Sequence, residues 1–218
     1  MIKRWIERVA VLAMVMVAVG CASSQQTFTY EPADIDPDYW LPKVDRFVVI
    51  VDGSGSMNYR YQKQKRLHIE RDLVLAMAET IPELDYESAL RAFGTGKCGS
   101  GGKTVLLEDV ETYLESGFES AGEEIQCAKG ASPMFAALDG ASGDLAGAEG
   151  KVAVIVISDG QQMNDKTFAA ARGLASRYGD NLCIYAIQIA NRGEGYDALQ
   201  RVASSARCGS VTPAESLT

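Results

Sequence analysis

Two uninterrupted apolar runs, each closely followed by Asp-Gly, constrain the fold of this 218-residue chain more than any other feature. Residues 47–51 and 152–157 are rich in β-branched side chains and do not alternate with polar ones. Such runs are typical of strands that are buried on both faces, as in a parallel sheet covered by helices. We therefore expect Asp52 and Asp159 at the carboxyl ends of central strands, the edge where open α/β sheets bind ligands.

The remaining patterns alternate between strand and helix, which favours an α/β, doubly wound sheet in three layers. Further strands are predicted at residues 86–93, 103–107, 182–189 and 210–212, with helices at 67–81, 110–125, from Ser132-Pro133 onward, at 165–178 and at 196–206. Ser before Pro is a helix-start signal, so a cap is one reading of Ser132. We expect His68, the single histidine, to lie at the exposed end of the 67–81 helix.

Three short oxygen-bearing side chains follow the first apolar run, namely Asp52, Ser54 and Ser56, with glycines between them. Glycine allows the sharp turns that bring such side chains together beyond the end of a strand. One carboxylate and two hydroxyls form a hard donor set suited to Mg²⁺, Mn²⁺ or Ca²⁺. A plain strand-to-helix turn has a similar composition, and these residues taken alone fit it equally well.

The later motifs favour the metal site. The order Asp52-x-Ser54-x-Ser56, then Ser132-Pro133 at a helix start, then Asp159 after a later strand resembles the metal-ion-dependent adhesion site of von Willebrand factor type A (VWA) domains. Ser132 stands where that pattern usually has Thr, and it keeps the hydroxyl. The resemblance covers residues 46 to about 212. It implies a mostly parallel central sheet with one antiparallel edge strand and helices on both faces.

The same resemblance implies a function. In such domains the two serines, the Thr position and the two aspartates hold Mg²⁺ or Mn²⁺, with Ca²⁺ disfavoured, and a partner protein offers a carboxylate to the metal. We therefore expect a binding protein and not an enzyme. Two alternatives stay open: a structural envelope lipoprotein with metal-independent contacts, and, ranked behind it, a metal-dependent hydrolase that uses Asp52 as base or nucleophile.

The N-terminus has the pattern of a bacterial lipoprotein signal. Lys3 and Arg4 precede an apolar run over residues 9–19, and Ala18-Val-Gly-Cys21 resembles a lipobox. This predicts a signal peptide over residues 1–20, a lipid anchor on Cys21, a flexible Pro- and Asp-rich tether over 21–45 and the VWA domain over 46–218. The phrases Ile81-Pro-Glu-Leu and Leu182-Cys-Ile-Tyr are similar to bacterial envelope lipoproteins. Ala22 favours the outer membrane, with the domain facing the periplasm.

Four cysteines remain when Cys21 is set aside. An even number in an oxidising compartment predicts two disulfides, for which three pairings exist. We favour Cys98–Cys127 and Cys183–Cys208, the second of which would join the start of one strand to the residues before the next.

The net charge of the chain indicates which kinds of partner it can bind. The formal net charge is −8, and removal of residues 1–20, which carry three basic residues and one acidic residue, makes it −10. An acidic domain attracts cations and offers no basic patch for phosphate backbones, so nucleic acid is not an expected partner. Within the tether, the apolar residues Tyr39, Trp40 and Leu41 are expected to pack on the core.

Overall fold

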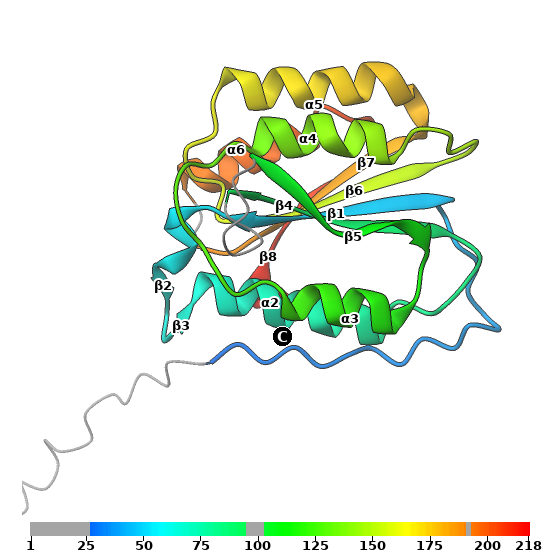
Figure 1. The fold of residues 1–218 in the computed structure, drawn as a ribbon, viewed down its shortest axis with the longest axis horizontal. Helices are drawn as coiled ribbons and strands as arrows, with labels where there is room; N and C mark the ends of the chain where they lie inside the picture. The colour runs from blue at the N-terminus through cyan, green and yellow to red at the C-terminus, as the bar shows by residue number, and fades with distance from the viewer. Residues whose placement is uncertain (1–26, 95–102, 191–192) are drawn as a thin grey trace, which may run out of the picture.

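A computed structural model describes residues 27–94, 103–190 and 193–218 of the chain (Figure 1). One six-stranded sheet forms the centre, in the order β5-β4-β1-β6-β7-β8. All neighbouring strands are parallel except β4 and β5, which pair antiparallel at one edge. The strands are β1 (Arg46–Gly53), β4 (Glu87–Gly94), β5 (Thr104–Thr112), β6 (Val152–Ser158), β7 (Leu182–Gln188) and β8 (Val211–Pro213).

Helices cover both faces of this sheet (Figure 1). One face carries α2 (Arg66–Thr80) and α3 (Glu115–Glu123), and the other carries α4 (Met134–Asp144), α5 (Asp165–Tyr178) and α6 (Glu194–Ala203). Two separate apolar cores result, because successive side chains of the strands point to opposite faces. In β1, Val49 and Val51 enter the core under α2, while Val48 and Ile50 enter the core under α4 and α5. The predicted three-layer α/β fold is confirmed.

One helix was predicted too long. Residues 110–112 belong to β5, which continues to Thr112 opposite Glu87, and the helix that follows covers Glu115–Glu123 alone. The pairing of β4 with β5 shifts register near Leu90, which lets the edge strand continue past the expected end. Backbone pairing with β4 makes residues 110–112 part of a strand. The helical spacing of apolar residues over 110–125 cannot reveal such pairing.

The segment before β1 lies against the domain from its first described residues. Phe28 is 5% exposed, stacks on Tyr61 with ring centroids 5.3 Å apart, and its N–H donates to Gln64 Oε1 at 3.2 Å. Ala33 N donates to Thr80 Oγ1 at the far end of α2. The chain therefore runs along the outer side of α2 before it reaches β1 (Figure 1).

The expectation that Tyr39, Trp40 and Leu41 pack on the core is wrong. Their exposed fractions are 85%, 56% and 86%. A turn closed by Tyr39 N donating to Asp36 O carries the chain away from α2 at this point, so no core surface faces these side chains. His68 is exposed, as expected.

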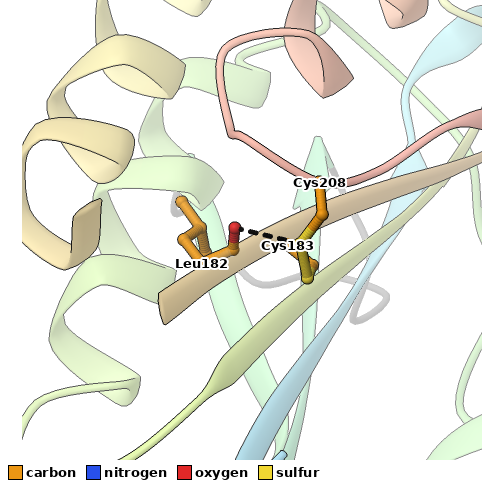
Figure 2. The surroundings of a disulfide bond; sticks show 3 residues. All are labelled: Leu182, Cys183 and Cys208. Atoms are coloured by element: carbon orange, nitrogen blue, oxygen red, sulfur yellow. Dashed lines mark hydrogen bonds between the residues drawn. A yellow bond between two sulfur atoms is a disulfide. The ribbon is translucent and has the colours of Figure 1, made fainter. Parts of the chain in front are cut away.

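The disulfide between Cys183 and Cys208 is confirmed (Figure 2). It joins the start of β7 to the residues before β8, and Ile184 N donates to Cys208 O at 3.0 Å beside it. β8 is only three residues long, so this crosslink reinforces a strand with few backbone contacts of its own. Cys127 is also disulfide-bonded. Its predicted partner, Cys98, lies outside the described residues, as does Cys21.

We expect the double variant Cys183→Ser/Cys208→Ser to lose about 3 kcal/mol of unfolding free energy, because the crosslink closes a loop of 25 residues in the unfolded chain. Urea unfolding followed by circular dichroism measures the loss. An unchanged unfolding free energy would show that β8 is held by packing alone.

Glu108 is a buried carboxyl group in β5. It is 8% exposed, and neither of its side-chain oxygens has a hydrogen-bond partner. Burial, followed by the nearby charge of Glu111, raises its pKa from 4.5 to about 7. Because the pKa in the folded protein is the higher one, folding favours the protonated form, and stability falls as the pH rises from about 4.5 through 7.

A glutamine side chain does not ionise, so the variant Glu108→Gln lacks this dependence of stability on pH. Relative to the unsubstituted protein, we expect it to gain on the order of 1–2 kcal/mol of stability between pH 5 and pH 8. Urea unfolding at the two pH values measures this difference, with the exposed Glu119→Gln as the matched control. A difference that does not change with pH would mean that Glu108 is ionised throughout.

Candidate metal centre

Asp52 occupies the end of the central strand and is fully buried. β1 and β6 are adjacent and parallel, with Val51 opposite Ile157, so the residues that follow them meet at one edge of the sheet. There Ser158 Oγ donates to Asp52 Oδ2 at 2.6 Å. The Ser158 oxygen also accepts from Gly160 N at 2.9 Å, which links the two strand ends. Sequence reasoning missed Ser158, because its role depends on which strand lies next to β1.

The loop after β1 brings the first three predicted ligands together. Ser54 N donates to Asp52 Oδ1 at 2.8 Å, and the hydroxyl oxygens of Ser54 and Ser56 lie 3.1 Å apart. Both serines are buried, at 2% and 6% exposed. The two hydroxyls and the carboxylate therefore form one compact set of oxygen donors, held by a short 3₁₀ helix, η1 (Gly55–Asn58).

A second loop lies directly against this one and carries Ser132. Gly55 N donates to Gly130 O at 3.0 Å, and Lys129 N donates to Gly53 O at 2.9 Å. A β-carbon at Gly55 would approach Gly130 O to 3.2 Å, so the contact is close enough to favour glycine. These backbone bonds fix the loop that leads to Ser132 beside the Asp52 loop.

Ser132 does not cap the helix that follows it. α4 begins at Met134 with Pro133 in the cap position, and no side-chain cap bond is formed. The Ser132 hydroxyl is instead buried without a hydrogen-bond partner. A buried hydroxyl without a partner costs on the order of 1–3 kcal/mol. The structure therefore does not support Ser132 as a helix cap.

Asp159 follows β6 and is 1% exposed. Its Oδ1 accepts from Gln161 N at 2.9 Å, and its Oδ2 accepts from Arg66 Nη1 at 2.6 Å. Arg66 is the first residue of α2 and reaches the site from the opposite side of the loop. The resulting ion pair is nearly dry, with side-chain exposures of 13% for Arg66 and 0% for Asp159. Sequence reasoning missed Arg66.

Glu70 is a third buried carboxyl group at the site. It is fully buried in α2, and its Oε1 accepts from Asp52 N at 2.6 Å. Its other oxygen has no partner. Sequence reasoning missed this residue too, although a signal existed. Glu70 precedes Leu73 and Val74 by three and four residues, so it lies on the apolar stripe of the helix, where a charge is unexpected.

Crowding and burial shift the pKa values of these acids. Burial, with a smaller effect from the charge of Asp159, raises the pKa of Asp52 to about 6, while the hydrogen bonds from Ser158 and Ser54 act in the opposite direction. Burial and then the charge of Asp52 raise the pKa of Glu70 well above its usual value. The site therefore disfavours uncompensated negative charge, and a proton or a cation close to these carboxyl groups would be stabilising.

A cavity of about 550 Å³ opens beside Asp159. It is lined by Arg66, Asp159 and the loops that follow β6 and β7. The loop after β6 touches the start of α6: a β-carbon at Gly160, whose φ is +74°, would lie 2.1 Å from the backbone oxygen of Gly195. Only glycine fits there, so the wall of the cavity has a fixed shape.

The donors present fit a small hard cation. Two carboxylates and three hydroxyls, one of them unpartnered, are the oxygen ligands that Mg²⁺ and Mn²⁺ accept. The described part of the chain has no group of three or more His, Cys, Asp or Glu side chains placed to hold a metal. The candidate site differs from such a cluster, because three of its five donors are serine hydroxyls. The five predicted ligands are thus carried by three loops at one end of the sheet.

The fold defines a class: the chain has the fold of a VWA domain, as solved structures of that class show. No protein-family model matches the chain, and no curated protein matches it. Solved structures do. BatB from Bacteroides thetaiotaomicron is 15% identical, with a TM-score of 0.61, over 77% of this chain and 89% of BatB.

Two further solved structures resemble the chain. A von Willebrand factor type A protein from Catenulispora acidiphila is 19% identical, with a TM-score of 0.58, over 80% of this chain and 40% of that one. Manganese-loaded TRAP protein from Plasmodium vivax is 18% identical, with a TM-score of 0.58, over 80% of this chain and 70% of TRAP. At these identities the likeness establishes the fold.

The hydrogen bond from Asp52 N to Glu70 Oε1 can be tested with two variants of Glu70. Glu70→Gln keeps an oxygen acceptor and is neutral, as the raised pKa of Glu70 favours, so we expect it to fold with little loss. Glu70→Ala leaves a buried N–H without an acceptor and should cost roughly 2–3 kcal/mol. Urea unfolding measures both. Equal losses would show that the acceptor is unimportant.

Proposed function

We propose that this domain binds a divalent cation, Mg²⁺ or Mn²⁺ rather than Ca²⁺, and through it an acidic residue of a partner protein. The observation that carries the proposal is the Ser132 hydroxyl. It is buried, has no hydrogen-bond partner, and follows by two residues Gly130, whose carbonyl accepts from Gly55 in the loop that carries Ser54 and Ser56. A metal ion would satisfy the hydroxyl oxygens of these three serines at once, together with Asp52 and Asp159.

The donor chemistry favours a partner with a carboxylate. Serine hydroxyls are neutral, so they coordinate a cation without cancelling its charge. A Mg²⁺ or Mn²⁺ ion held mainly by hydroxyls remains electrophilic, and an incoming Asp or Glu side chain completes its coordination. The metal-loaded state of TRAP, which shares the fold, supports a divalent cation as the ligand.

The sequence supports a location in the cell envelope, with a lipid anchor on Cys21 and the domain on the periplasmic side of the outer membrane. No helix among the described residues is long and apolar enough to cross a bilayer. Phe28 packs on Tyr61, just after the metal loop, and Cys21 precedes Phe28 by seven residues, a reach of at most about 25 Å. An anchor at Cys21 would therefore keep the metal site close to the membrane surface.

The hydrolase alternative needs a group that transfers protons, and two candidates among the described residues are poorly placed for this role. His68 is exposed, and Glu70, the carboxyl group next to Asp52, is fully buried with its Oε1 engaged by Asp52 N. We therefore propose a binding protein and not an enzyme. A structural lipoprotein with metal-independent contacts remains the competing hypothesis, and the experiment below separates the two.

Asp52→Ala removes the one carboxylate that touches the hydroxyl loop. We expect Mn²⁺ binding, measured by calorimetric titration into residues 27–218, to be saturable in the unsubstituted domain and to fall by at least 100-fold in the variant. Partners captured from envelope extract in the presence of Mn²⁺ should be lost with EDTA and with the variant alike.

Asp139→Ala is the matched control, because Asp139 is an exposed carboxylate on α4. It should bind Mn²⁺ as the unsubstituted domain does. Partner capture that survives both EDTA and Asp52→Ala would overturn the proposal and favour the structural hypothesis.

A further inference from the structure

Arg66 is a built-in cation at the candidate metal centre. Its guanidinium donates to Asp159 Oδ2 at 2.6 Å, and the Asp159 side chain is fully buried. Asp159 Oδ1 already accepts from Gln161 N. Each oxygen of this carboxylate already has a partner. A cation bound at Asp159 Oδ2 would lie beside the guanidinium, and the two positive charges would repel each other.

The charges around Asp159 also favour one cation, and not two, at this carboxylate. Without Arg66, the charges of Asp159 and Asp52 would be buried side by side with no counter-ion among the contacts described here, an arrangement that folding strongly disfavours. A divalent cation supplies the same neutralisation. With both present, two positive charges would crowd one carboxylate in dry surroundings, where repulsion is poorly screened.

Hydrogen bonds do not hold every polar atom of the Arg66 side chain, so the side chain can move. Its Nε is buried without a hydrogen-bond partner, and its guanidinium lies 5.9 Å from the centre of the exposed Tyr59 ring. The side chain also lines the 550 Å³ cavity beside Asp159. The guanidinium therefore has space next to it that it can enter without disturbing the core.

We propose that Arg66 is an internal competitor of the metal: the arriving divalent cation replaces the guanidinium at Asp159, and Arg66 moves out toward the cavity. This rests on the proposed function, which it deepens. Arg66 is a positioning residue in this account. It holds Asp159 ready in the metal-free protein, and it weakens metal binding by the free energy needed to displace it.

The test uses Arg66→Gln in the full chain, since glutamine keeps an N–H donor but carries no charge. We expect calorimetric titration to show Mn²⁺ binding at least tenfold tighter than in the unsubstituted domain. In EDTA the variant should melt at a lower temperature, because Asp159 has lost its counter-ion, and Mn²⁺ should raise its melting temperature more than it raises that of the unsubstituted domain.

Two controls isolate the effect. Arg71→Gln removes the same charge from α2 at a partly exposed position whose nearest acid is Asp72, so its Mn²⁺ affinity should not change by tenfold. Arg66→Lys keeps the charge and should restore competition. A Mn²⁺ affinity in Arg66→Gln that equals or falls below that of the unsubstituted domain overturns the inference but leaves the metal site standing.

A second measurement needs no variant. Phenylglyoxal modifies exposed arginines, and peptide mass spectrometry quantifies the product at each site. We expect Mn²⁺ to accelerate modification of Arg66 and to leave Arg71 unchanged. Unchanged or slower modification of Arg66 on saturation with Mn²⁺ overturns the inference. If no variant and no form of the domain binds Mn²⁺, the proposed function fails together with it.

Discussion

The burial of carboxyl groups at the end of β1 is the constraint on which the rest of the site depends. Asp52 and Glu70 have no exposed surface, and Asp159 has 1%. Ionised carboxylates in such surroundings are costly unless hydrogen bonds or opposite charges compensate. Ser158, the backbone N–H groups of Ser54 and Gln161, and the guanidinium of Arg66 supply that compensation. A set of polar groups so deep in the protein is retained for a purpose other than packing.

The architecture explains why these groups gather at one edge. A parallel sheet with helices on both faces leaves no room for polar side chains along its central strands, and β1 is buried along its whole length. In β1 and β6, the polar side chains lie at the ends of the strands. At the carboxyl end, the loops after β1 and β6 are brought together by strand pairing, and the loop before α4 is bound to them by its backbone.

The two edges of the sheet are stabilised by different means. At one edge the antiparallel β5, which carries Glu108, pairs along β4. At the other edge the short β8 is joined to the start of β7 by a disulfide. The central strands, which carry the site, lie between these edges and depend on neither for their own burial. The site can therefore keep its geometry while the periphery varies in stability.

The sequence by itself determined the class of fold and five candidate ligands, because long apolar runs and their Asp-Gly ends are local patterns. It also indicated the Cys183–Cys208 pairing. Only the tertiary structure decided which residues surround those ligands. Strand order placed Ser158 on Asp52, and the packing of α2 across the sheet edge brought Arg66 and Glu70 to the site. The exposure of Trp40, the length of β5 and the unpaired hydroxyl of Ser132 likewise depend on contacts between residues far apart in the chain, which no local pattern records.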